Sequence, residues 1–226
     1  MSKVTVTALQ IPVSDHINTN ARVLKRNILA NKTSDWIVTP ECSLSGYCQA
    51  PVLSDMDTRA IERYEKKLEE VEGSQQNHST GLILGTGHVE GDGMPRNQAR
   101  VYNRNGDLLS TYSKRLLCRG FTGGGETHYY LPGYEPNYFY VDSDQKFIAS
   151  TLICNDAWGT PKVTWDGNPH FGWQLAQQGV KVIFVLANCN VKTFDPLVYA
   201  YHDSHLRQMA RDNNIWVVVS NSSIAM

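Results

Sequence analysis

Three residues with chemically capable side chains each follow a predicted β-strand. Glu41 comes after a short apolar run, Lys114 follows the second strand of a predicted hairpin, and Cys154 directly follows the run 147–153. A thiol can attack a carbonyl or nitrile carbon, a carboxylate can accept the thiol proton, and an ammonium can stabilise the oxyanion that develops. Because rigid strands fix the residues that follow them, strand ends commonly carry functional groups. The three residues together suggest a cysteine-dependent hydrolase.

Each of these residues, taken alone, has a more ordinary explanation. A glutamate after a proline is typical of a loop charge, and a lone lysine is typical of a solvated surface. A cysteine that ends a strand is typical of a small buried apolar residue. The functional interpretation therefore depends on the three residues occurring together and on the segments around them.

Those longer segments resemble the nitrilase, or carbon–nitrogen hydrolase, superfamily, whose members carry a Glu-Lys-Cys triad in this chain order. The similarity extends from about residue 4 to residue 221. The segments that carry it are NQARVYNRNGDLLSTYSKRLL from Asn97, Glu126 with the following YLPG, QLAQQGVKVIFVLAN from Gln174, and MARDNNIWVVVSN from Met209.

The resemblance implies a role for each matched residue. Glu41 is expected to act as general base and Cys154 as the nucleophile that forms a thioester. Lys114 and the backbone N–H of Asn155 are expected to stabilise the oxyanion. Glu126 is expected to keep Lys114 charged and aimed, and to contact the substrate. Ammonia is the expected first product, and the mechanism needs no metal or organic cofactor.

The residues after the nucleophile favour one class of substrate. The chain reads Cys154-Asn155-Asp156, whereas nitrilases of this superfamily usually have Trp-Glu after the cysteine. The sequence thus resembles the amide- and ureide-cleaving branches, and an amide or N-carbamoyl substrate is favoured over a nitrile. Asp156 itself is expected to brace the turn.

Two departures from the family pattern stand out. Leu116 occupies the position two residues after Lys114 where the family often has histidine. The family pattern also continues past Asn221 with a strand pair, a Gly-x-Ser motif and often a tail used in dimer contacts. We therefore expect one carbon–nitrogen hydrolase domain over residues 1–226 that is short at its C-terminus.

Hydrophobic periodicity predicts an α/β fold, a layered sandwich of mixed sheets, and the family resemblance implies a four-layer α-β-β-α sandwich of two mixed sheets. Near-continuously apolar strands alternate with helices, which indicates sheets covered on at least one face. Asn105-Gly106 predicts a hairpin, which argues against a purely parallel sheet. Strands are predicted at 4–11, 35–39, 81–89, 99–103, 108–112, 147–153, 182–186 and 215–219, and helices at 17–30, 58–72 (with Asp57 as N-cap), 171–178 and 197–213.

Composition narrows the class of partner. The net charge of −1 gives no reason to expect nucleic acid or an anionic membrane, and no apolar run approaches the ~18 residues that span a bilayer. The five cysteines are odd in number, widely spaced and without a C-x-x-C pair, which suits a reducing cytoplasm. No signal peptide is visible at the start of the sequence. A small-molecule amide or ureide is the expected substrate, and a homodimer or higher homo-oligomer is implied by the resemblance.

Other chemistries have weaker support. A Ser-His-Asp hydrolase lacks its G-x-S-x-G elbow, and Gly123 to Gly125 lacks the Lys-Ser/Thr of a phosphate loop. His202 and His205 share a helix face, but further metal ligands are not identifiable. Arg119 and Lys162 could bind a substrate carboxylate, although an ordinary surface charge is favoured for each.

Three functions stay open beside amide or ureide hydrolysis. They are nitrile hydrolysis, a catalytically silent sandwich that serves protein association, and an ammonia-producing domain that feeds a partner synthetase. The silent scaffold is disfavoured because Glu41, Lys114 and Cys154 are all present. The synthetase alternative is disfavoured because no synthetase-like sequence follows.

Overall fold

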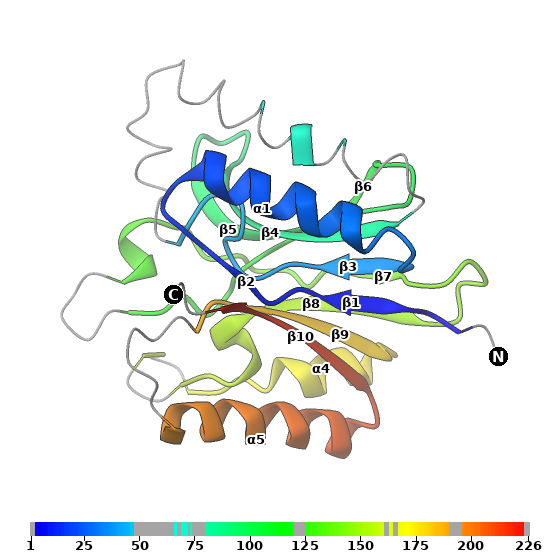
Figure 1. Cartoon of the computed structure of the whole chain (residues 1–226). Helices are drawn as coiled ribbons and strands as arrows, with labels where there is room; N and C mark the ends of the chain where they lie inside the picture. Colours follow the sequence, from blue (N-terminus) through cyan, green and yellow to red (C-terminus); the bar gives the residue numbers. More distant parts are fainter. Residues whose placement is uncertain are drawn as a thin grey trace.

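Two five-stranded mixed sheets face each other, with helices on both outer sides (Figure 1). The computed structural model describes residues 3–47, 66, 69–71, 73, 80–119, 125–160, 163–164, 167–189 and 196–223. The layers run helix, sheet, sheet, helix, so the predicted four-layer α-β-β-α sandwich is confirmed. Among the described residues, no helix is long and apolar enough to cross a membrane.

The first sheet has the strand order β1-β3-β4-β5-β6. β1, β3 and β4 run parallel, whereas β4, β5 and β6 run antiparallel, as the predicted hairpin requires. Gly106 in the hairpin turn has φ 89°, a conformation that glycine adopts without strain. The strands are β1 (Val6–Ala8), β3 (Trp36–Val38), β4 (Gly81–Val89), β5 (Pro95–Tyr102) and β6 (Leu108–Ser113).

The second sheet has the order β2-β10-β9-β8-β7. Its four strands from β2 to β8 are parallel, and β7 is antiparallel to β8. Since β8, β9 and β10 run in the same direction, their carboxyl ends lie at one edge of the molecule. The strands are β2 (Ile11–Pro12), β7 (Phe139–Tyr140), β8 (Ile148–Ile153), β9 (Val182–Ala187) and β10 (Trp216–Ser223).

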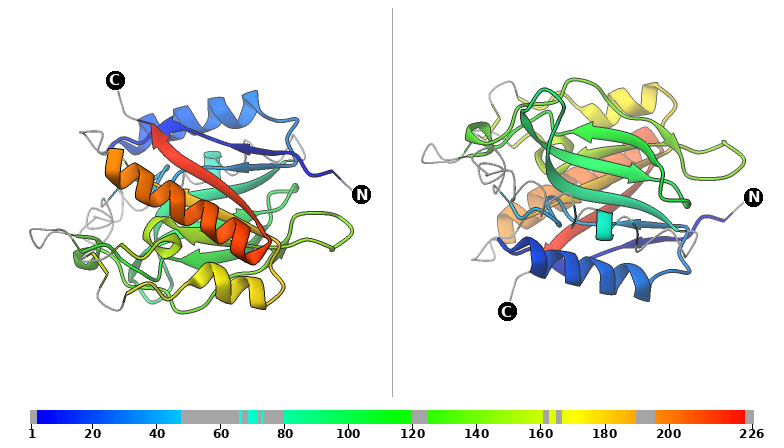
Figure 2. Two further views of the ribbon diagram at one scale, coloured as in Figure 1. Left: turned by 90° about the horizontal axis from the view of Figure 1, so that it is seen from below. Right: turned by 90° about the horizontal axis from the view of Figure 1, so that it is seen from above.

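Among the described residues, three α-helices cover the outer faces of the sheets, α1 on the first, and α4 and α5 on the second (Figure 2). Two 3-10 helices, η1 and η2, carry site residues. Most of the predicted helix 58–72, including its N-cap Asp57, lies outside the described residues. The helices are α1 (Ile17–Ala30), η1 (Glu126–His128), η2 (Cys154–Ala157), α4 (Phe171–Gln177) and α5 (Pro196–Asn213).

The predicted single strand 4–11 is wrong, because the chain changes sheets within it. β1 belongs to the first sheet and β2 to the second. Leu9 lies between them: its N–H donates to Val38 O at 2.9 Å, and its carbonyl accepts from Ser220 Oγ at 2.6 Å. Leu9 is thus hydrogen-bonded to both sheets, and apolar alternation cannot reveal such a crossing because it continues on either side.

Alternation along β3 divides the core into two parts. Ile37 packs with Leu24 and Ile28 of α1 under the first sheet. Trp36 and Val38 face the other way, into the core between the sheets. Both cores exclude water from the central strands, so the strand ends are firmly positioned.

Candidate active site

Glu41 lies just beyond β3, where the two sheets meet. Its backbone N–H donates to Ala187 O at the end of β9, at 3.3 Å, so the loop is attached to both sheets. Gly85 makes this approach possible, because a Cβ at that position would collide with the carbonyl oxygen of Pro40. The Glu41 side chain is 0% exposed.

Lys114 follows β6 and places its ammonium between two carboxylates. Its Nζ donates to Glu41 Oε1 at 2.7 Å and to Glu126 Oε1 at 2.9 Å. All three side chains are fully buried. The backbone of Lys114 is fixed on both sides, with its N–H donating to Asn97 O and its carbonyl accepting from Gly133 N. The structure therefore brings together the three charged residues that the sequence singled out.

Asn97 on β5 completes this cluster. Its Nδ2 donates to Glu41 Oε1 at 2.8 Å and to Glu126 Oε1 at 2.9 Å, and the second Glu126 oxygen accepts from the backbone N–H of Cys118 at 2.7 Å. Sequence reasoning gave Asn97 no role. An amide at an inward-facing position of a buried strand was the available signal, because such a group must find polar partners.

One oxygen of this cluster stays unused. Glu41 Oε2 is buried and has no hydrogen-bond partner among the described residues. Burial raises the pKa of Glu41 to about 7, although Lys114 opposes the shift. Burial by itself would lower the pKa of Lys114, but neighbouring Cys118, Glu126 and Glu41 outweigh it and raise that pKa well above its usual value. Glu41 can thus take up or release a proton near neutral pH beside a permanent cation.

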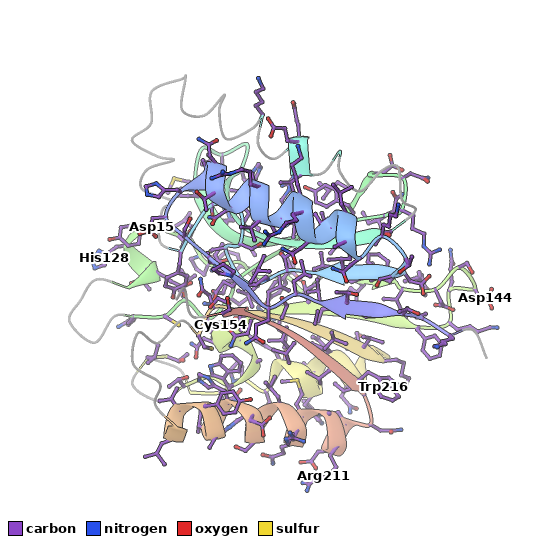
Figure 3. All side chains as sticks on the ribbon, viewed as in Figure 1. Asp15, His128, Asp144, Cys154, Arg211 and Trp216 are labelled. Carbon is purple, nitrogen blue, oxygen red and sulfur yellow. The ribbon has the colours of Figure 1, made fainter. Side chains whose placement is uncertain are left out.

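Cys154 lies at the end of β8, on the first residue of η2, near the ends of β9 and β10 (Figure 3). Its φ of 49° is uncommon for a residue with a side chain and makes a sharp strand-to-helix turn. The thiol is almost buried, and the charges of Glu41 and Lys114 both act on it. Two main causes raise the pKa of Cys154 well above its usual value: the larger is its interaction with the Cys189 thiol, and the second is burial.

Asp156 ties the cysteine turn to the lysine loop. Its carboxylate accepts from the backbone N–H groups of Leu116 at 2.7 Å and Ile153 at 3.2 Å, and from Tyr112 Oη at 2.9 Å. These contacts give Asp156 the bracing role expected of it. Since the acceptor is shared, the loop that carries Lys114 and the turn that carries Cys154 keep a fixed relative position.

The side chain of Asn155 supports the neighbouring loop. Its Nδ2 donates to Leu116 O and Thr164 Oγ1, and its Oδ1 accepts from Thr160 N at 2.8 Å. These partners occupy the side chain, so only the backbone N–H of Asn155 concerns the oxyanion prediction.

The other residues considered in the sequence do not join the cluster. His202 Nδ1 contacts Cys189 Sγ at 3.6 Å, whereas His205 Nδ1 contacts Tyr201 O at 2.9 Å. Within the described ranges, no three His, Cys, Asp or Glu side chains are grouped as metal ligands. The Arg119 N–H donates to Val163 O, and Lys162, Gly123 and Gly124 lie outside the described residues.

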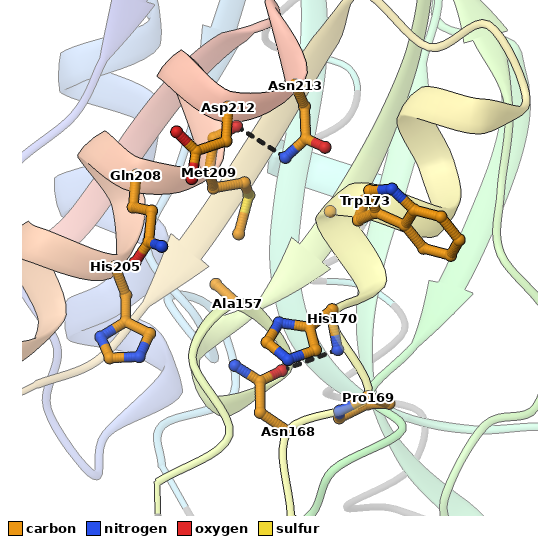
Figure 4. Close-up of a pocket in the computed structure, with 11 residues that line it drawn as sticks. Ala157, Asn168, Pro169, His170, Trp173, His205, Gln208, Met209, Asp212 and Asn213 are labelled. Carbon is orange, nitrogen blue, oxygen red and sulfur yellow. Dashed lines mark hydrogen bonds between the residues drawn. The ribbon is translucent and has the colours of Figure 1, made fainter.

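Two of the cavities adjoin α5. One, of about 460 Å³, lies between α4 and α5, with His170, His205 and Met209 among its lining residues (Figure 4). The other, of about 470 Å³, lies between α5 and the ends of β9 and β10 and is lined by Cys189 and His202. The second cavity is lined by Cys189, whose thiol interacts with that of Cys154, whereas no cysteine is among the residues that line the first.

A model of the carbon–nitrogen hydrolase family matches residues 5–223 of the chain. The chain belongs to the carbon–nitrogen hydrolase family.

One curated relative of this carbon–nitrogen hydrolase chain is a glutamine-dependent NAD(+) synthetase from Aquifex aeolicus (strain VF5). It is 26% identical over 221 residues, which are 98% of this chain and 35% of the relative. The chain thus spans about a third of the length of the curated relative it matches.

Two solved structures share the fold. An amidase from Nesterenkonia sp. superposes with a TM-score of 0.75 at 16% identity, over 98% of this chain and 76% of the amidase. A glutamine-dependent NAD+ synthetase from Acinetobacter baumannii superposes with a TM-score of 0.76 at 21% identity, over 97% of this chain and 38% of the synthetase.

Proposed function

We propose that this chain hydrolyses a non-peptide amide bond through a thioester on Cys154 and releases ammonia. The observation that carries the proposal is the buried Oε2 of Glu41, which has no hydrogen-bond partner within the described part of the chain and lies beside a thiol and a fixed ammonium. Such an oxygen is unfavourable in a purely structural ion pair, because a buried acceptor without a donor costs about 1–3 kcal/mol. A carboxylate that accepts a proton during catalysis needs one oxygen that is not already occupied by a hydrogen-bond donor.

The proposed reaction runs in two halves that share one proton carrier. Glu41 takes the proton of Cys154, whose sulfur attacks the amide carbon. The carbon–nitrogen bond then breaks, and Glu41 gives the proton to the departing ammonia. Water next loses a proton to Glu41 and attacks the thioester. The carbon–sulfur bond breaks, and the proton returns to sulfur. A pKa of about 7 suits both directions of transfer.

Lys114 and the backbone N–H of Asn155 are proposed to stabilise the tetrahedral oxyanion. Glu126 keeps the ammonium in place, since it accepts from Lys114 Nζ and is itself held by the Cys118 N–H. Asn97 donates to the same carboxylate oxygen of Glu41 and of Glu126 that accepts from Lys114, and so holds both carboxylates beside that ammonium. Because these groups are already oriented, little reorganisation is needed when charge develops.

Glutamine is a second, more specific candidate substrate. The observation that favours it is the match of 98% of this chain to a glutamine-dependent NAD(+) synthetase. If glutamine is the substrate, the ammonia released at Cys154 serves a synthetase. The sequence alone disfavoured this function, an ammonia-producing domain that feeds a partner synthetase. The chemistry at Cys154 is the same, and only the acyl group and the fate of ammonia differ.

Ammonia release from a panel of substrates tests the proposal. The panel contains L-glutamine, simple aliphatic amides, N-carbamoyl amino acids and aliphatic nitriles, each with the wild-type chain and with Cys154→Ala. We expect release from amides that disappears in the variant. Ammonia release that persists in Cys154→Ala contradicts the assignment of Cys154 as nucleophile. Release from nitriles or N-carbamoyl compounds alone contradicts the assignment of an amide as substrate.

A diazoketone analogue of glutamine separates the two candidates. It should alkylate Cys154 if the pocket accepts glutamine, and mass spectrometry of the Cys154 peptide detects the adduct without any turnover. Absence of both release and adduct favours the silent scaffold. Homo-oligomerisation and a cytoplasmic location stay predictions, as does the assignment of residues 1–226 to one domain.

A further inference from the structure

A second thiol lies against the proposed nucleophile. Cys189 follows β9, the strand that pairs in parallel register with β8, which ends at Cys154. The two neighbouring strand ends place the thiols close enough for each to shift the pKa of the other. Both cysteines are free in this structure.

Cys189 is held in place by three further residues. Its backbone N–H donates to Asn221 Oδ1 at 3.0 Å, and its sulfur lies 3.6 Å from His202 Nδ1. The His202 ring stacks on Trp158 with a centroid distance of 4.0 Å. The imidazole is therefore fixed beside the sulfur.

The two thiols differ in ionisation and in access. The hydrogen bond from Cys154, assisted by His202, lowers the pKa of Cys189 to about 5. Cys154 retains its proton and is almost buried, whereas Cys189 is half-buried and lines the cavity of about 470 Å³. Thiolates, not thiols, react with peroxides, and a nearby second cysteine can then close a disulfide.

We propose that Cys189 and Cys154 form a peroxide-reactive thiol pair, in which a hydroperoxide oxidises Cys189 and Cys154 then closes a disulfide. The covalent outcome depends only on these two residues. Its consequence for activity rests on the proposed function, because the disulfide removes the nucleophile.

Both steps balance. The Cys189 thiolate attacks one oxygen of the hydroperoxide, the O–O bond breaks, and the leaving oxygen takes a proton and departs as water or an alcohol. Cys189 is then a sulfenic acid. The Cys154 sulfur attacks that sulfur, the S–O bond breaks, and the hydroxide leaves with the Cys154 proton as water. Two thiols have lost two electrons to one peroxide.

The other two described cysteines are poorly suited to this chemistry. Burial raises the pKa of Cys42 and of Cys118, so both stay protonated at neutral pH. Cys42 Sγ points to Asn97 Oδ1 at 3.5 Å, and Cys118 Sγ lies 4.0 Å from Lys114 Nζ. Neither has an imidazole partner among the contacts of the described residues, as Cys189 has.

Peptide mass mapping after hydrogen peroxide treatment tests the pair. We expect a peptide linked through Cys154 and Cys189 in the wild type, accompanied by loss of ammonia release that dithiothreitol restores. A linkage to Cys118, or inactivation with only irreversible oxidation of Cys154, overturns the proposal. Cys189→Ser should show no linked peptide, and any oxidation of Cys154 that remains should appear as sulfenic, sulfinic or sulfonic acid without a cross-link.

A matched pair of histidine variants tests the role of the imidazole. His202→Asn removes the ring beside Cys189, and we expect the disulfide to form at least about ten-fold more slowly, since less thiolate is present. His205→Asn changes a histidine on the same helix that contacts Tyr201 O instead, and should leave the rate unchanged. Equal rates in the two variants overturn the role of His202. Mass detection keeps this result independent of turnover, so an inactive chain still reports on the pair.

Discussion

The charged cluster around Lys114 and the thiol pair of Cys154 and Cys189 lie side by side but are held very differently. Lys114, Glu41 and Glu126 are fully buried and joined by hydrogen bonds of 2.7–2.9 Å. The thiol pair has longer and weaker contacts, such as the 3.6 Å from Cys189 Sγ to His202 Nδ1, and a cavity on one side. The first region provides fixed charges, and the second provides a reactive sulfur.

This difference follows from what each group tolerates. Charges that are buried without partners are strongly unfavourable, so the cluster must be complete to exist at all. Thiols tolerate apolar surroundings and weak hydrogen bonds, so their contacts can be loose and can change during a reaction. The first region should therefore govern stability and the second reactivity, and four predictions test that division.

Lys114→Met should have the largest effect on stability. The change leaves two buried carboxylates without their shared cation, and we expect a loss of about 3–5 kcal/mol in the free energy of unfolding. Lys146→Met is the matched control, because the Lys146 side chain is 68% exposed and pairs with Asp144 on the surface. The control should lose no more than about 1 kcal/mol. Urea denaturation measures both, and equal losses would contradict the division.

Asn97→Ala should have the next largest effect. It removes one donor from each of Glu41 and Glu126, which should lower the free energy of unfolding by about 1–3 kcal/mol. The hydrogen bond from Asn97 also lowers the pKa of Glu41, so its loss should move the rise of kcat/KM to higher pH. A stable variant with an unchanged pH profile would show that Asn97 is only a space-filling residue.

Cys154→Ala should barely change stability although it abolishes turnover. The thiol has weak contacts, and we expect the free energy of unfolding to change by less than about 1 kcal/mol. Thermal or urea unfolding of the variant beside the wild type measures this. A large loss of stability would mean that the thiol pair is as structural as the charged cluster.

The pH dependence of kcat/KM tests the proton transfer between the two regions, from Cys154 to Glu41, in the unmodified protein. Glu41 must be ionised to accept the thiol proton, so kcat/KM for an amide should rise as pH rises through about 7. Glu41→Gln should abolish most of the activity, and the activity that remains should not rise with pH around 7. Glu135→Gln, which changes an exposed glutamate, should leave the profile intact. A rise of kcat/KM centred near the usual pKa of a glutamate would contradict the raised pKa of Glu41.

The elements that could be predicted are those whose signal is local. The apolar spacing of Leu24 and Ile28 predicts α1, and Asn105-Gly106 predicts the hairpin between β5 and β6. The crossing at Leu9 was missed, because a strand that passes from one sheet to another keeps the same alternation. Asn97 and the Cys189–His202 contact were missed because their partners are distant in sequence.

The sequence by itself determined which strands end in a carboxylate, an ammonium or a thiol, since side-chain type and strand period are local properties. Only the tertiary structure decided which of those ends meet. The loops after β3 and β6 of one sheet bring Glu41 and Lys114 to the edge where β8 and β9 of the other sheet bring Cys154 and Cys189. The physical reason is that sheet packing buries both inner faces at once, and the relative position of two sheets depends on contacts across the whole core.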